Sequence, residues 1–130
     1  MITIEHIALW VQDLDSFCAF YERNFGVTVG ELYENPAWGF RSRFLSFSSG
    51  ARLEAMSTTT LDPVSLPPGA QRMGLTHFAI SLGSESAVDE LTARLKEEGV
   101  SVLDNPRWTG DGYYESVILD PEGNRIELTI

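Results

Sequence analysis

The segment DPEGNRIELTI, residues 120–130, decides the fold. Its first five residues are strong turn formers, and the residues after them alternate between polar and apolar, as in a half-buried β-strand. Residues 48–56, SSGARLEAM, repeat the same order of turn and strand. Both segments fit the pattern G-x-R-[L/I]-E, which predicts two copies of one hairpin strand.

The repeat extends to the beginning of each copy. The runs IEHIALWV, residues 4–11, and LTHFAISL, residues 75–82, each place a His two residues before an Ala on a short β-type run. Apolar residues at helical spacing follow both runs, and a glycine closes each predicted helix, Gly26 in the first copy and Gly99 in the second. The candidate N-caps are Asp13 or Asp15 for the first helix and Ser84 or Ser86 for the second.

Each copy therefore reads β-α-β-β-β. The sequence predicts an α+β fold of two tandem βαβββ modules, residues 1–56 and 75–130, which together make one domain. Residues 57–74 are rich in Ser, Thr, Pro and Gly and are predicted to be a linker. The weaker middle strands are expected near residues 27–33, 41–47, 100–103 and 113–119.

Composition narrows the range of functions. The chain has 9 Lys+Arg against 19 Asp+Glu, a formal net charge of −10, so neither nucleic acid nor an anionic membrane is an expected partner. No apolar run approaches the roughly 20 residues of a membrane span, and the first residues lack the pattern of a secretory signal, so a cytoplasmic protein is expected. The single cysteine, Cys18, excludes an intramolecular disulfide and a multi-cysteine metal site.

Four polar residues at matching repeat positions form the candidate site. Strand alternation places Glu54 and Glu127 opposite their aliphatic neighbours, away from the helices. His6 and His77, the only two histidines, start equivalent strands. If the modules face each other about a pseudo-twofold axis, these side chains converge and can hold a divalent metal with bonds of about 2.0–2.2 Å. The alternative is an inert polar groove.

Over essentially its whole length the chain resembles the vicinal oxygen chelate superfamily, the glyoxalase, bleomycin-resistance and dioxygenase group. Residues 6–26, HIALWVQDLDSFCAFYERNFG, look like the opening strand and helix of that family, and residues 113–130, YYESVILDPEGNRIELTI, like its closing hairpin. The chain resembles in particular small bacterial proteins of the glyoxalase I, or lactoylglutathione lyase, type. The resemblance implies an eight-stranded, open, cup-shaped sheet with the helices outside.

The same resemblance implies a metal site and a reaction. Carried over by position, His6, Glu54, His77 and Glu127 would hold Ni²⁺, Co²⁺, Zn²⁺ or Mn²⁺. The reaction implied is a lyase or isomerase step, in which a proton beside a carbonyl is removed through a metal-bound enediolate of a 2-oxoaldehyde–thiol adduct or a similar vicinal-oxygen substrate. Glu127 is the preferred base, and Glu54 is the other candidate.

The substrate is where the sequence departs from the resemblance. Glutathione-using relatives commonly have an Arg four residues after the first metal position, where this chain has Trp10, and an aromatic ring cannot pair with a carboxylate. Arg41 and Arg43 are candidates to receive an anionic substrate. Alternation sends Tyr113 and Tyr114 to opposite faces, and Tyr113 is the candidate to line the cup. An aromatic wall for an apolar substrate would use Trp10, Trp38, Phe40 and Trp108.

Other functions remain open at this point. A bleomycin-resistance-type binding protein would use the same cup without a metal, a thiol transferase would normally use two His and one Glu, and an extradiol-type dioxygenase would use two His and one carboxylate. The resemblance also implies a small-molecule partner and a homodimer. The four ligands would come together either within one chain or across that dimer.

Overall fold

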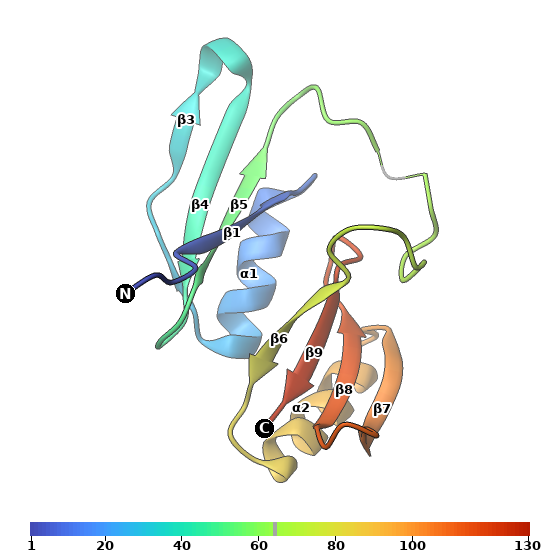
Figure 1. The fold of residues 1–130 in the computed structure, drawn as a ribbon. Helices are drawn as coiled ribbons and strands as arrows, with labels where there is room; N and C mark the ends of the chain where they lie inside the picture. The colour runs from blue at the N-terminus through green and yellow to red at the C-terminus, as the bar shows by residue number, and fades with distance from the viewer. Residues whose placement is uncertain (64) are drawn as a thin grey trace. The chain divides into compact units, whose positions relative to one another are not determined.

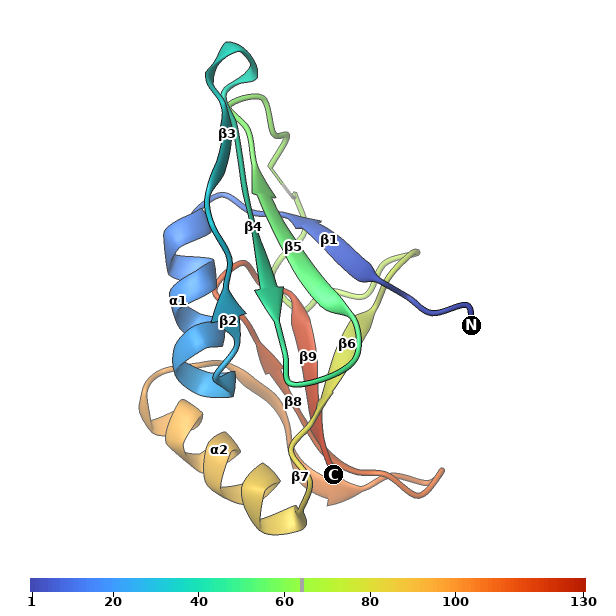
Figure 2. The same ribbon diagram turned by 90° about the vertical axis from the view of Figure 1, so that its left-hand side faces the viewer.

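A computed structural model describes residues 1–63 and 65–130 of the chain. These residues divide into two compact units, Met1–Val64 and Ser65–Ile130. In each unit one long helix lies against one face of a β-sheet, as Figure 1 and Figure 2 show from two sides. We call this the helix face of the sheet and the opposite side the helix-free face.

The first unit has a mixed sheet in the order β1-β5-β4-β2, with β3 paired to β4. The β1 and β5 strands run parallel, whereas β4 is antiparallel to β5, β2 and β3. The parallel pair brings the first histidine strand next to the first G-x-R-[L/I]-E strand. The elements in chain order are β1 (His6–Trp10), α1 (Leu14–Phe25), β2 (Thr28–Val29), β3 (Tyr33–Asn35), the 3-10 helix η1 (Pro36–Trp38), β4 (Phe40–Ser46) and β5 (Arg52–Ser57).

Helix α1 begins and ends where the sequence predicts. The Asp13 side chain accepts a hydrogen bond of 3.0 Å from the backbone N–H of Ser16, which caps the first turn. Gly26 closes the helix in the left-handed conformation, with φ 64°, which glycine adopts without steric cost. The apolar side of α1, including Phe17 and Tyr21, is fully buried against β4 and β5.

The second unit repeats this plan with a sheet in the order β6-β9-β8-β7. The β6 and β9 strands are parallel, and the two hairpin pairs are antiparallel. The second histidine strand therefore also lies next to a G-x-R-[L/I]-E strand. The elements are β6 (His77–Ser81), α2 (Glu85–Glu97), β7 (Val102–Trp108), β8 (Tyr114–Leu119) and β9 (Arg125–Thr129).

Helix α2 begins at a serine N-cap and contacts the sheet through a buried pair of hydroxyls. The Ser84 hydroxyl accepts a hydrogen bond of 3.2 Å from the backbone N–H of Ala87, so Ser84 rather than Ser86 is the N-cap. Within the core, the Thr92 hydroxyl of α2 donates to the main-chain oxygen of Val88 at 2.6 Å and accepts from the Ser116 hydroxyl of β8, 2.7 Å away.

Two predicted strands differ from the structure. The strand expected over residues 27–33 is split into β2 and β3, because one extra residue moves the register from Val29 opposite Leu45 to Tyr33 opposite Ser42. The strand expected over residues 100–103 continues as β7 to Trp108 and includes Pro106. Proline is tolerated there because β7 is an edge strand of its sheet.

The structure confirms the α+β class and the two βαβββ modules, with β2 and β3 together in the place of one broken strand. Both sheets are open. The union of the modules in one cup, and the limits assigned to the linker, stay predictions. None of the helices in the described part of the chain is long and apolar enough to cross a lipid bilayer.

Candidate functional site

The first unit brings His6 and Glu54 together on the helix-free face of its sheet. In the parallel register His6 lies opposite Arg52, two residues before Glu54. Leu53 and Ala55 are buried on the helix face, so the glutamate between them points the other way. The Nε2 atom of His6 lies 3.7 Å from Oε1 of Glu54. This unit therefore presents an imidazole nitrogen and a carboxylate side by side.

Another carboxylate, that of Glu5, fixes the second ring nitrogen of His6. Nδ1 of His6 and the guanidinium of Arg52 both donate to Glu5, and these hydrogen bonds, the one from His6 most, hold the pKa of Glu5 below its ordinary value. The Arg52 guanidinium also lies over the Phe44 ring, 4.0 Å from its centroid. A proton on Nδ1 leaves the Nε2 lone pair of His6 for a ligand on the side of Glu54. The sequence reasoning did not identify Glu5.

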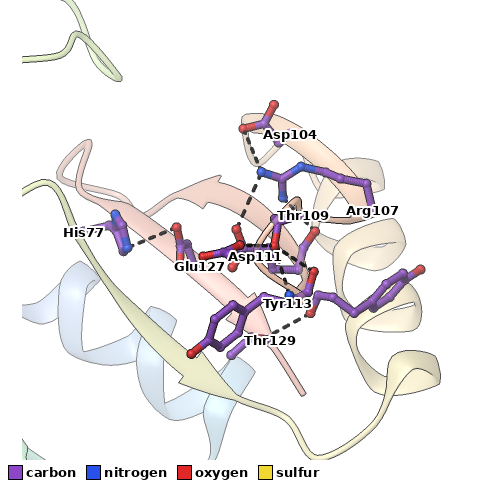
Figure 3. Close-up of polar contacts among 10 residues, drawn as sticks. His77, Asp104, Arg107, Thr109, Asp111, Tyr113, Glu127 and Thr129 are labelled. Carbon is purple, nitrogen blue, oxygen red and sulfur yellow. Dashed lines mark hydrogen bonds and ion pairs between the residues drawn. The ribbon is translucent and has the colours of Figure 1, made fainter.

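The second unit repeats the pair with His77 and Glu127, as Figure 3 shows. In the register Ala79, two residues after the histidine, lies opposite Glu127. Ile126 and Leu128 are fully buried on the helix face. The Nε2 atom of His77 lies 3.0 Å from Oε1 of Glu127. Both imidazoles are more than one third exposed and both carboxylates about one fifth exposed, so the two pairs have similar access to a ligand.

Glu115 is a further carboxyl beside Glu127 that sequence reasoning missed. It lies opposite Thr129 in the register, on the same face as Glu127, and is 8% exposed. Burial raises the pKa of the Glu115 carboxyl above its ordinary value, and the neighbouring Glu127 raises it further. Arg107 donates to the Glu115 main-chain oxygen at 2.9 Å, and its Nη2 lies 3.6 Å from the side chain. Alternation along β8, combined with its pairing register with β9, is the signal that places Glu115 on the face of Glu127.

The donor set of the two pairs fits a divalent transition-metal ion. Imidazole nitrogen and carboxylate oxygen are the common ligands of such ions, and protein sites use three or four of them. In the described residues no three His, Cys, Asp or Glu side chains gather into a group that could hold a metal ion. Each unit by itself thus carries two candidate ligands, one His and one Glu.

Arg41 and Arg43 do not lie with these ligands. Arg43 is opposite the buried Ala55 in the register, and its Nη1 donates to the main-chain oxygen of Gly30 at 2.7 Å. Arg41, two residues earlier, lies 3.7 Å from Asp15 on α1. Both arginines are therefore on the helix face, and the structure does not bring them to the metal-ligand candidates of their unit. Alternation predicted that they share a face but could not say which one.

Tyr113 and Tyr114 point to opposite faces, as predicted, and the structure shows which face each of them takes. The hydroxyl of Tyr114 donates to Asp89 on α2 at 2.5 Å, which raises the pKa of Tyr114 to about 12. Trp108 packs against the same ring, with 5.2 Å between centroids, and is therefore on the side of α2. Tyr113 is 57% exposed, and alternation places it on the helix-free side with Glu115 (Figure 3).

Trp10 lies at the end of β1 on the helix-free face of the first unit. Its ring contacts Phe40 edge-to-face, with 6.2 Å between the ring centroids, and Tyr33 also contacts Phe40, with 6.0 Å between centroids. Trp38 is part of η1 and is 74% exposed. The structure therefore gathers Trp10 and Phe40, two members of the expected aromatic wall, and adds Tyr33, which sequence reasoning did not include.

Known proteins share this sequence pattern. Residues 3–128 match the family model described as the Glyoxalase/Bleomycin resistance protein/Dioxygenase superfamily. The chain is also 30% identical over 130 residues to "Uncharacterized protein PA2024" of Pseudomonas aeruginosa, a match that covers 98% of this chain and 87% of that protein.

Solved structures share the fold. The glyoxylase/bleomycin resistance protein/dioxygenase domain from Frankia sp. EAN1pec has a TM-score of 0.81 at 17% identity, with 100% of this chain and 98% of that chain covered. The trypanothione-dependent glyoxalase I of Leishmania major has a TM-score of 0.76 at 23% identity, with 99% and 86% covered.

Proposed function

Because the chain belongs to the Glyoxalase/Bleomycin resistance protein/Dioxygenase superfamily, we propose that it is a metal-dependent lyase or isomerase of the glyoxalase I type. The proposed substrate is a 2-oxoaldehyde–thiol adduct or a similar compound with two adjacent oxygens. One observation carries the proposal above all: both units place a His Nε2 within 4 Å of a Glu Oε1 on the helix-free face. The pair occurs at the same place in both copies of the repeat.

In this proposal His6, Glu54, His77 and Glu127 together hold one Ni²⁺, Co²⁺, Zn²⁺ or Mn²⁺ ion. The ion, when bound, supplies Lewis-acid polarisation of two adjacent substrate oxygens, which makes the neighbouring C–H bond more acidic. The chain orients the donor atoms of these residues. Glu5 does this for His6, because it accepts a hydrogen bond from Nδ1–H and leaves the Nε2 lone pair for the metal.

The proton transfer is assigned to a glutamate. Glu127 takes the proton from the carbon beside the carbonyl and returns it to the adjacent carbon, so that the product is an isomer of the substrate and no oxidant is needed. Glu54 is the second candidate for this role, from the opposite repeat. Glu115 and Arg107 do not contact the substrate in this proposal. Glu115 lies beside Glu127, and Arg107 lies beside Glu115, so both are positioning residues.

We further propose that the protein works as a homodimer in the cytoplasm on a small-molecule substrate. The superfamily match and the net charge of −10 support a partner that is neither nucleic acid nor an anionic membrane. Tyr113 and Trp10, both exposed on the helix-free side of their units, are proposed substrate contacts.

The test compares three proteins: wild type, His77→Ala and Glu127→Gln. Each is stripped with a chelator, reloaded with Ni²⁺ or Zn²⁺, and analysed for bound metal and for isomerisation of hemithioacetals made with glutathione and with other thiols. We expect about one ion per chain in wild type and little metal in His77→Ala, because an imidazole ligand is lost. Glu127→Gln should keep most of the metal and lose at least about 100-fold in kcat, because the amide cannot take a proton.

Two outcomes contradict the proposal in different ways. Turnover near the wild-type level in Glu127→Gln removes Glu127 as the base and leaves the metal site intact. Absence of metal in all three proteins removes the lyase mechanism. A metal-free binding protein is then the better account, and the exposed aromatic rings of the first unit are the observation that favours it.

A further inference from the structure

Three aromatic side chains stand together on the helix-free face of the first unit: Trp10, Tyr33 and Phe40. We call this group the aromatic platform. In the register Trp10 lies opposite Met56, Met56 lies opposite Ser42, and Ser42 lies opposite Tyr33, so these side chains point to the same side of the sheet. Phe40 precedes Ser42 by two residues on β4 and therefore shares this face.

The platform is ordered by its own ring contacts and yet is open to a ligand. Phe40 contacts both Trp10 and Tyr33 edge-to-face, with 6.2 and 6.0 Å between the ring centroids. Trp10 is 53% exposed and Tyr33 is 59% exposed. Rings fixed against each other lose little further freedom when a flat molecule covers them, and gathered exposed aromatic surface of this kind marks binding sites.

The charges around the platform indicate what kind of ligand it takes. Arg52, the arginine on the helix-free face of β5, already donates to Glu5 and stacks on Phe44. The two arginines of β4 are turned to the helix face, as described above. The platform therefore lies beside the carboxylate of Glu54 without an uncommitted arginine from β4 or β5. This arrangement disfavours an anionic ligand group and suits an uncharged one.

The platform is also within reach of the metal-ligand candidates. Glu54 precedes Met56, the cross-strand neighbour of Trp10, by two residues. Two residues of a strand span about 7 Å, a distance that a phenyl ring attached to the chelating group can cover with its van der Waals surface. A ligand whose two adjacent oxygens lie at His6 and Glu54 can therefore place a directly attached ring on Trp10.

We propose that the aromatic platform binds a flat, uncharged apolar substituent of the substrate, so that the preferred substrates are aromatic vicinal-oxygen compounds rather than compounds with an anionic group. This inference rests on the proposed function, because it names the substrate class of the same site. Trp10 is the central specificity-determining residue.

The test uses two hydroxamates, which chelate through two oxygens on adjacent atoms and differ only in the group on the carbonyl carbon. Benzohydroxamate carries a phenyl ring and acetohydroxamate a methyl group. Each is titrated into the Zn²⁺-loaded and into the chelator-treated protein, for wild type, Trp10→Ala and Trp108→Ala. Trp108 is a matched control, because it is 59% exposed but packs on Tyr114 at the side of α2. The readouts are the Kd and the three indole N–H resonances, one for each tryptophan.

We expect wild type to prefer benzohydroxamate over acetohydroxamate by about three- to tenfold, as contact with an aromatic ring provides. The Trp10 indole resonance should shift with benzohydroxamate only. Trp10→Ala should remove the preference, Trp10→Phe should retain part of it, and Trp108→Ala should leave it unchanged. Trp10→Phe also shows that the effect belongs to the ring and not to a general loss of folding.

The results separate this inference from the proposed function. Metal-dependent binding of both hydroxamates with equal Kd, or a preference that survives in Trp10→Ala, overturns the platform and leaves the lyase proposal intact. A benzohydroxamate preference that needs Trp10 but not Zn²⁺ supports the platform and counts against the lyase. If the Trp10 indole resonance shifts with protein concentration and not with added hydroxamate, a second copy of the chain covers the platform. That result overturns the inference.

Discussion

Glu115 is a buried carboxyl, and its ionisation should change the unfolding free energy of the protein with pH. Its pKa is raised, first by burial and then by Glu127. A carboxyl with a raised pKa favours folding below its unfolded-state pKa, and that contribution is lost as the pH rises through the folded-state pKa. Glu115→Gln cannot ionise. The unfolding free energy of the variant minus that of wild type should therefore increase as the pH rises above about 4.5.

Urea denaturation of both proteins between pH 4 and pH 8, after treatment with a chelator, measures this difference. The chelator keeps metal off Glu127 in both proteins, so that metal binding does not enter the comparison. A difference that stays constant over the pH range would mean that the Glu115 carboxyl ionises alike in the folded and unfolded chain.

The sequence predicts the direction in which site residues point better than it predicts their neighbours. Alternation in a G-x-R-[L/I]-E strand correctly turned Glu54 and Glu127 away from the buried aliphatic residues. It did not find Glu115, because that contact depends on the register between β8 and β9. Glu5 was missed for a different reason: hydrogen bonds between adjacent side chains depend on rotamers, which no residue pattern contains.

At the scale of the elements, the start of α2 depends on one hydroxyl. The sequence offered Ser84 and Ser86 as caps, and the structure has Ser84 accepting from the backbone N–H of Ala87. Ser84→Ala should lower the unfolding free energy by about 1 kcal/mol, because an N–H of the first turn loses its partner. Ser86→Ala is the matched control and should change it by a few tenths at most, because alanine is favoured inside a helix.

Urea denaturation of the two variants and wild type, monitored by the far-ultraviolet circular dichroism signal, gives both values. Equal losses in the two variants would show that the hydroxyl pair matters as a unit, because the Ser84 and Ser86 hydroxyls lie 3.2 Å apart.

Helices were easier to predict from this sequence than the middle strands. Caps, closing glycines and apolar spacing are local signals, and α1 begins and ends where they place it. Helix α2 begins after the predicted cap Ser84 and ends at Glu97, with Glu98 as its C-cap and Gly99 next. The break between β2 and β3 follows from one extra residue opposite β4, which is a relation between two strands. Residues 104–106, Asp-Asn-Pro, look like a turn locally, but the edge position of β7 allows them in a strand.

At the scale of the whole molecule, the question is which chain supplies each half of the ligand set. We expect the site to be shared across the proposed homodimer, and subunit complementation tests this. His6→Ala and His77→Ala chains are unfolded together in equal amounts, refolded and reloaded with metal. Random pairing makes half of the dimers mixed, and one of the two sites in a mixed dimer keeps all four ligands. About a quarter of the wild-type metal content should therefore return.

Each variant refolded alone serves as the control and should hold little metal. A mixture that holds no more metal than the separate variants would mean that the four ligands come from one chain. Sedimentation of the same samples checks that dimers were present.

The proline in β7 has a consequence beyond the fold of one unit. A flat edge strand displays a row of backbone N–H and C=O groups that can capture a strand of another molecule, which is the first step of fibril growth. In β7 the row is interrupted, since Pro106 has no N–H and the pairing with β8 shifts register twice. Partly unfolded chains that meet at this edge find an imperfect template, so we expect β7 to resist edge-to-edge pairing between molecules.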